Sequence, residues 1–266
     1  MLKEELVERI DSKFLASVDL ENEVWKIDAE GLGYRDLNDL LRVICCSGAK
    51  KIEICNVYGQ RYIGTDLESD VQITIYGTPG NDLGAFMNGP LVIVHGNAQD
   101  GCGNTMNEGQ IIVHGSSGDL TGHSMRGGRI LVREDVGYRV GIHMKEYQKK
   151  KPQIVVGGTA QDFLGEYMAG GVILVLGLNL PEGKCCKARF VGTGMHGGVI
   201  YERGRILEVG KGTKAMKVGK RDCIIIESLV REYCDRFGVD FEKVMSEQFR
   251  KIVPVSKRPY GELYSQ

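Results

Sequence analysis

Aspartates at a regular spacing are the first residues of this sequence whose type could support chemistry. Asp100, Asp119 and Asp162 each stand three residues before a glycine. Carboxylates aligned in this way could act as general acids and bases, or bind a cation. Aspartates in turns, which accept hydrogen bonds from nearby backbone amides, explain the same spacing. The turn role is favoured, and a stand-alone enzyme that uses this aspartate column is kept as an alternative.

The five histidines are candidate metal ligands. His95 and His114 each stand eight residues before a glycine of the same series, so their rings are expected to stack about one strand spacing apart. Tyr76 and Arg133 occupy the neighbouring positions of this column and add no acidic ligand. Because a zinc site needs three or four converging ligands, a structural ladder is favoured over a metal site. The other histidines fall in three different columns of the pattern: His123, His143 and His196.

Cysteine and glycine motifs complete the search for a site. The chain has eight cysteines, but the vicinal pairs at 45–46 and 185–186 are poor metal chelators, and no pair has the C-x-x-C spacing. Residues 192–197 match the dinucleotide-binding pattern G-x-G-x-x-G, which requires a helix directly after it. Residues 199–201, Val-Ile-Tyr, predict a strand instead. We therefore predict no catalytic, cofactor-binding or metal-binding residue in this chain.

The glycines of these columns belong to a repeat of the form Gly-x-x-Met. Successive repeat glycines are separated by 20, 19, 19, 19, 24 and 27 residues, and such self-similarity indicates a repeat architecture. In the first unit, leucine takes the place of methionine. The units are Gly64/Leu67, Gly84/Met87, Gly103/Met106, Gly122/Met125, Gly141/Met144, Gly165/Met168 and Gly192/Met195.

Pairs of β-branched residues recur before the repeat glycines, with one residue between the members of each pair. This alternation is typical of a strand with one buried face. The period is too short for a propeller blade, and the pattern of a leucine-rich repeat is missing. The sequence therefore predicts an all-β fold, a parallel β-helix of about seven coils, in which like residues stack at about 4.8 Å. The pairs are Ile73/Ile75, Val92/Val94, Ile111/Val113, Ile130/Val132 and Ile154/Val156.

Flanking segments of different character divide the chain into three parts. Residues 1–50 are expected to form an N-terminal cap with a short helix, residues 51–204 the parallel β-helix, and residues 205–266 a C-terminal helical tail and cap. Caps are expected because each end of a β-helix presents an unpaired strand edge, which is a hazard for aggregation.

Amphipathic patterns predict three helices in the flanks, over residues 36–46, 222–237 and 241–249. Two insertions interrupt the repeat, around residues 145–152 and 178–187. In solenoid proteins such insertions map to loops, which are natural places for contacts with partner proteins.

The charge balance and the hydropathy bear on partners and location. The 34 basic and 35 acidic residues nearly cancel, so neither nucleic acid nor an anionic membrane is expected as a partner. No apolar run approaches the ~20 residues of a membrane span, and no signal peptide opens the sequence. We therefore expect a cytoplasmic protein whose cysteines are reduced.

Several segments between residues 52 and 204 carry a resemblance to a known family. They include GNDLGAFM at 80–87, SMRGG at 124–128, GYRVGIHM at 137–144 and GEYMAGG at 165–171. Together they resemble the C-terminal GXGXG β-helix domain of the large subunit of glutamate synthase. This resemblance implies a right-handed parallel β-helix that serves as a scaffold between a glutamine amidotransferase domain and an FMN and iron–sulfur synthase domain.

The resemblance therefore implies a non-catalytic scaffold subunit of a split glutamate synthase-like complex. Its expected partners are a glutamine amidotransferase subunit and an FMN-dependent synthase subunit. No cofactor is expected in this chain, and FMN and the iron–sulfur cluster are expected in the partner subunits. Formylmethanofuran dehydrogenase and N-methylglutamate synthase each have a subunit with the same repeat, so a scaffold of either enzyme is an alternative. A homo-oligomer is also compatible with the sequence.

Overall fold

The structure, a computed structural model, describes residues 17–181, 186–204, 206 and 208–256 of the 266-residue chain. The helices of this part are α2 (Tyr34–Cys46), α3 (Lys220–Phe237) and α4 (Phe241–Met245). The strands are β1 (Val18–Glu21), β2 (Val24–Asp28), β3 (Lys51–Tyr58), β4 (Gln72–Thr78), β5 (Asn88–His95), β6 (Glu108–Val113), β7 (Arg129–Val132), β8 (Gln153–Val156), β9 (Ala169–Val175), β10 (Gly197–Arg203), β11 (Thr213–Lys217) and β12 (Phe249–Pro254).

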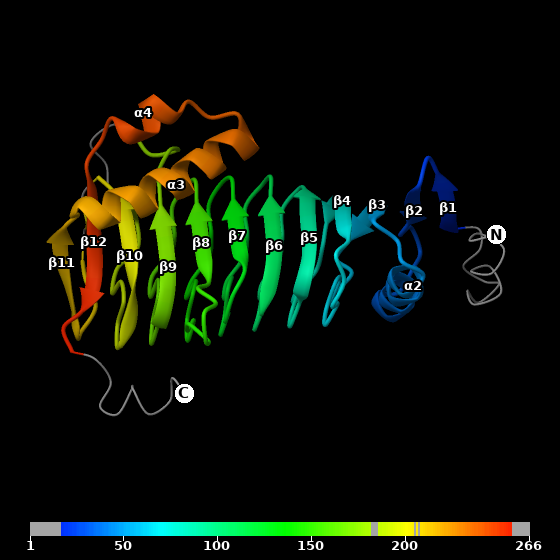
Figure 1. The fold of residues 1–266 in the computed structure, drawn as a ribbon, viewed down its shortest axis with the longest axis horizontal. Helices are drawn as coiled ribbons and strands as arrows, with labels where there is room; N and C mark the ends of the chain where they lie inside the picture. Colours follow the sequence, from blue (N-terminus) through cyan, green and yellow to red (C-terminus); the bar gives the residue numbers. More distant parts are fainter. Residues whose placement is uncertain (1–16, 182–185, 205, 207, 257–266) are drawn as a thin grey trace.

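The strands form one sheet that follows the chain along an elongated body (Figure 1). From β2 to β10 each strand pairs in parallel with the next. At one end β1 pairs antiparallel with β2, and at the other β12 lies antiparallel between β10 and β11. The predicted all-β parallel β-helix is confirmed.

The solenoid makes about six turns rather than the seven predicted. The seven repeat glycines, from Gly64 to Gly192, mark seven corners of one kind but enclose only six intervals. The prediction counted every repeat unit as a closed coil, whereas a turn needs a corner at both of its ends.

The strand register confirms the predicted columns of β-branched residues. Ile73 pairs with Val92, and Val92 pairs with Ile111. Every member of the column is fully buried, so the column forms one wall of the solenoid interior. It comprises Ile73, Val92, Ile111, Ile130, Ile154, Ile173 and Ile200.

Each repeat glycine meets a backbone and a steric requirement together. Gly122 has φ of +71°, in the left-handed region that favours glycine. A Cβ atom there would lie 2.4 Å from Cδ1 of Ile154, which packs into the space that the glycine leaves. Its N–H donates to the carbonyl oxygen of Cys102 in the preceding coil, at 2.7 Å. The repeat glycine therefore joins a left-handed corner to the stacking of the isoleucine column.

The methionine of each unit fills the interior beneath the next corner. All six are at most 2 % exposed. A Cβ atom on Gly171 would lie 3.0 Å from Cε of Met144, and one on Gly128 would lie 2.5 Å from Cε of Met106. The second glycine of each Gly-Gly turn therefore makes room for the methyl group of the preceding unit's methionine. A flexible thioether suits this irregular space.

Helix α2 closes onto the interior near the N-terminal end. Its residues Leu37, Leu40, Leu41 and Ile44 are at most 2 % exposed and belong to the same core as the solenoid columns, as the amphipathic pattern predicts. After the helix, the N–H of Gly48 donates to the carbonyl oxygen of Cys45 at 3.0 Å.

Helix α3 lies along the outer face of the sheet and not over its end, where the sequence led us to place a cap (Figure 1). Leu229 and Tyr233 pack there, and the hydroxyl of Tyr233 donates to the carbonyl oxygen of Arg133 at 2.8 Å. A Cβ atom on Gly157 would lie only 1.8 Å from that hydroxyl, so glycine is required beneath it. Outward apolar side chains need this cover: Ile112, Leu131, Val155, Leu174 and Tyr201.

The C-terminal segment after α3 returns to the sheet. The helix predicted over 241–249 ends at Met245, because Phe249 already pairs with Arg203 as β12 begins. In β12, Ile252 pairs with Ile200 and is fully buried. The strands β12 and β11 therefore extend the sheet beyond β10.

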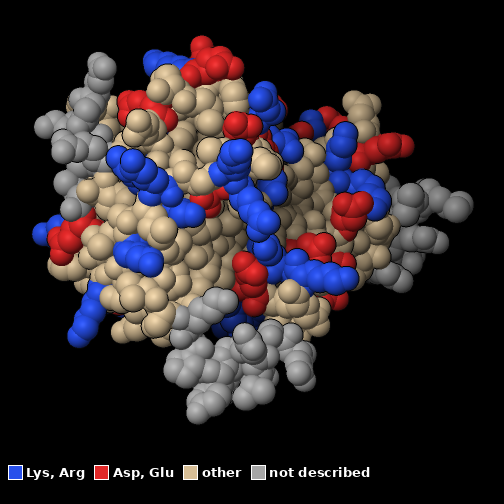
Figure 2. Space-filling model, turned by 60° about the vertical axis from the view of Figure 1, so that its left-hand side comes forward, with Lys and Arg blue, Asp and Glu red and all other residues tan. Residues whose placement is uncertain are grey.

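The insertions and the surface carry mixed charges. In the first insertion, Lys150 forms an ion pair with Glu108 at 2.7 Å. In the second, residues 182–185 lie outside the described residues. Figure 2 shows basic and acidic side chains close together on one face. Among the described helices, none is long and apolar enough to cross a membrane.

Candidate functional site

The aspartate column links one coil to the next. Oδ1 of Asp100 accepts a hydrogen bond from the backbone N–H of Asp119 at 2.9 Å, and Oδ1 of Asp119 accepts one from that of Tyr138 at 2.8 Å. Asp162 accepts bonds from the backbone and the guanidinium of Arg189, and these bonds lower the pKa of its carboxyl group. The amides belong to the following coil and not to the local turn, so these carboxylates stabilise the stack.

The histidine ladder is also present as predicted. The rings of Tyr76 and His95 stack with centroids 4.9 Å apart, and those of His95 and His114 stack at 4.7 Å. Phe237 of α3 meets His114 edge-on at 5.3 Å. Burial, with smaller contributions from His95 and Arg133, lowers the pKa of His114. The ladder thus belongs to the packing of the outer face.

The segment that matches G-x-G-x-x-G is followed by β10, a strand, as the sequence predicts. Among the described residues, no group of three or more His, Cys, Asp or Glu side chains is placed to hold a metal ion. The cysteines that the structure describes are free thiols.

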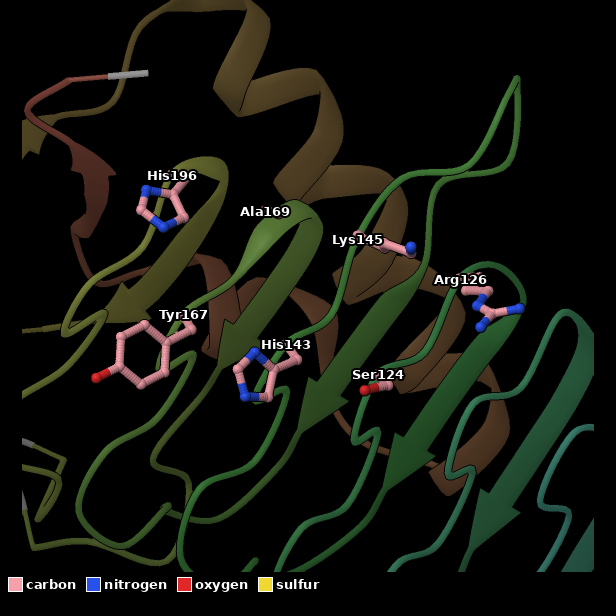
Figure 3. A pocket seen from close by; sticks show the side chains of 7 residues that line it. All are labelled: Ser124, Arg126, His143, Lys145, Tyr167, Ala169 and His196. Carbon is pink, nitrogen blue, oxygen red and sulfur yellow. The ribbon is translucent and has the colours of Figure 1, made fainter. Parts of the chain in front are cut away.

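A pocket of about 430 Å³ opens on the corner that follows the repeat glycines (Figure 3). Its lining comes from the second and fourth positions after four successive repeat glycines. We call it the corner pocket, and it is lined by Ser124, Arg126, His143, Lys145, Tyr167, Ala169 and His196.

The hollow exists because small residues interrupt two columns of larger ones. Ala169 stands between Lys145 and His196, whose longer side chains border the gap (Figure 3). A Cβ atom on Gly194 would lie 2.5 Å from the ring of Tyr167, so that ring lies over the glycine. On its other side the ring stacks on His143, with centroids 5.4 Å apart and planes 11° from parallel.

The corner pocket gathers hydrogen-bond donors and positive charge. Neither Asp nor Glu is among its lining residues. Neither Arg126 nor Lys145 forms an ion pair with any described residue. The Nε atom of Arg126 is buried and has no hydrogen-bond partner among the described residues. The arrangement is therefore suited to an acceptor-rich, negatively charged group.

The pocket is hidden in the sequence when the histidines are grouped by column. His123, His143 and His196 do occupy different columns, yet the corner brings the last two to one hollow. The signal lies in the positions counted from each repeat glycine: His143 stands at the second position, and Arg126 and Lys145 stand at the fourth. Comparison of these positions between units shows that basic side chains gather on one corner.

A second group of aromatic rings and guanidinium groups lies two or three residues before the repeat glycines. Phe163 and Phe190 stack with centroids 5.2 Å apart, and the guanidinium of Arg139 lies 5.4 Å from the ring of Phe163. Tyr138 is 50 % exposed beside them, and Arg189 lies over Phe190. We call these five residues the aromatic–arginine strip.

A carboxyl group is buried inside the last coils. Glu202 is 1 % exposed, and its Oε1 atom has no hydrogen-bond partner among the described residues. Burial raises the pKa of Glu202 to about 7. Cys186 is also buried, and its thiol shares a hydrogen bond with the hydroxyl of Thr159 at 3.1 Å. Burial, and to a smaller extent the charge of Glu202, raises the pKa of this thiol.

Comparison with known proteins adds two findings. A family model described as the GXGXG motif matches residues 39–257 of the chain. A protein of Methanocaldococcus jannaschii, named "Uncharacterized protein MJ1350", is 48 % identical over 252 residues, which cover 90 % of this chain and 95 % of that protein.

Proposed function

Because the chain belongs to the GXGXG motif family, we propose that it is a non-catalytic scaffold subunit of a split glutamate synthase-like complex. The partners are a glutamine amidotransferase subunit and an FMN-dependent synthase subunit, which also carries the iron–sulfur cluster, and the complex works in the cytoplasm. Besides the family, the support for this proposal is the resemblance of the repeat to the GXGXG domain that bridges those two activities in glutamate synthase.

The build of the coils supports a mechanical role. Coil-to-coil bonds engage the carboxylates of Asp100 and Asp119, and the isoleucine and methionine columns are buried in the interior. Closely packed interiors transmit strain and resist compression. A rod of this kind holds two bound proteins at a fixed separation.

The aromatic–arginine strip is the observation that carries the docking role. Tyrosine and arginine are enriched among the residues that dominate binding energy in protein interfaces, and large exposed aromatic rings provide apolar contact. Leu120, at the same kind of corner, adds a further 37 % exposed apolar side chain. The strip therefore offers anchors for a partner subunit.

Truncation of the strip is expected to release a partner subunit. Phe163 and Phe190 have φ of +64° and +56°, so glycine removes their rings without backbone strain. In affinity purification of the tagged chain from its native cells, the double variant Phe163→Gly, Phe190→Gly should recover at least about tenfold less of one partner than the unmodified chain, because interface anchors contribute about 2 kcal/mol or more.

Phe86→Gly is the matched control, since Phe86 is also exposed, has φ of +59° and lies outside the strip. This control should recover both partners in full. Recovery of both partners by the double variant would remove the docking role of the strip, and absence of both partners from the unmodified chain would overturn the scaffold proposal.

A further inference from the structure

We propose that the corner pocket binds the phosphate group of a small phosphorylated molecule, with Arg126 and Lys145 as its anchors. This inference goes beyond the scaffold role, because a scaffold does not require a ligand of its own. It rests on the lining of the pocket and on the unpaired state of its cations among the described residues.

The first argument is the buried donor of Arg126. Its Nε atom has no partner among the described residues, although the atom is shielded from solvent. A buried donor left unsatisfied is costly, and more so when the group is charged. Arg126 also lines the corner pocket, so an acceptor bound there would compensate its guanidinium, and an anion would do so better than a neutral ligand.

The second argument is the sign and the number of the groups around the hollow. Lys145 lies one coil from Arg126, which places the two cations about 4.8 Å apart along the stack at their backbones. The hydroxyl of Ser124 and the imidazole of His143 line the same hollow. With no carboxylate in the lining, nothing in the pocket neutralises the two cations from within.

The third argument selects phosphate over a single carboxylate. Donors from four successive coils surround the hollow, the last of them His196. A carboxylate has two acceptor oxygens, whereas a phosphate group presents three and carries up to two charges. The tetrahedral group can therefore meet guanidinium, ammonium and hydroxyl donors that approach from different coils.

Isothermal titration of the purified full-length chain with inorganic phosphate, at low ionic strength, tests the proposal. Lys145→Gln and Arg126→Gln should each weaken phosphate binding by about tenfold or more, as expected for loss of a charge-assisted hydrogen bond. Lys217→Gln, on the exposed strand β11, should leave the affinity unchanged. Lys145 is exposed, so its replacement leaves the fold intact.

Ala169 offers a sharper pair of variants. Ala169→Glu would place a carboxylate between Lys145 and His196 and should lower phosphate affinity at least about tenfold, whereas Ala169→Gln, of equal size, should have a clearly smaller effect. Titrations with malonate and chloride complete the test. No heat from phosphate, equal affinities for the Glu and Gln variants, or tighter binding of malonate or chloride than of phosphate would overturn the proposal.

Discussion

Replacement of Met144 by alanine is expected to lower the free energy of unfolding by about 2–5 kcal/mol. The side chain is fully buried, and its methyl group fills the space that Gly171 leaves open. Alanine would leave a void in a stack whose backbone is held on both sides. The N–H of Lys145 donates to the carbonyl oxygen of Met125 in the preceding coil at 3.0 Å, and the N–H of Ala169 in the following coil donates to that of Met144 at 2.8 Å. The coils therefore cannot collapse into the gap, and the loss should lie toward the upper part of this range. Denaturant unfolding, with the midpoint and slope compared between variants, measures the change.

Two further methionine variants make this result specific. Met144→Leu conserves most of the volume and should cost less than about 1.5 kcal/mol. Met216→Ala, on the edge strand β11 where the side chain is 43 % exposed, should change stability by no more than about 0.5 kcal/mol. Equal losses for Met144→Ala and Met216→Ala would contradict the interior position of the methionine column.

Between pH 5 and pH 8 the free energy of unfolding of the unmodified chain is expected to fall by about 3 kcal/mol, and the variant Glu202→Gln is expected to keep this stability. Burial raises the pKa of Glu202 to about 7, while the carboxyl of an unfolded chain titrates near about 4.3. The folded protein therefore holds this proton more tightly than the unfolded chain does. Its contribution to stability is complete below about pH 4.3 and is lost as the pH rises through about 7.

Glutamine has the shape of the acid but no proton to lose. The free energy of unfolding of Glu202→Gln should therefore lack the decline that the unmodified chain shows between pH 5 and pH 8. Unfolding in urea at intervals over this range gives both profiles, and the exposed Glu227→Gln should reproduce the unmodified profile. Parallel profiles for the Glu202 variant and the unmodified chain would show that the carboxyl does not titrate in the buried state described.

Inward-facing columns could be predicted from the sequence because the stack repeats them. Gly122 has a counterpart in every repeat unit and Met125 in every unit but the first, and the pairing of Ile111 with Ile130 follows from the period alone. A one-residue slip would turn a buried side chain outward, so the hydrophobic pattern fixes the register. The same reasoning predicts the stacked rings of His95 and His114, which the structure contains at 4.7 Å.

Contacts between distant segments and departures from the repeat were not predictable in this way. Leu131 and Val155 belong to an outward column of apolar residues that repeats from coil to coil. The column indicates a face that needs cover, but not that α3, a distant segment of the chain, provides it. The corner pocket depends on a small residue, Ala169, in a column of longer ones. The cover by α3 is a contact between distant segments and the pocket is a departure from the repeat, whereas the repeat itself was the source of the predictions.

The composition of the native assembly tests the scaffold role most directly. The untagged chain would be purified from its native cells by its own mass and chromatographic behaviour, and the intact assembly weighed by native mass spectrometry with identification of every chain. The scaffold role predicts that this chain is found with a glutamine amidotransferase subunit and an FMN-containing synthase subunit. Recovery of the chain alone, or only with copies of itself, would contradict it.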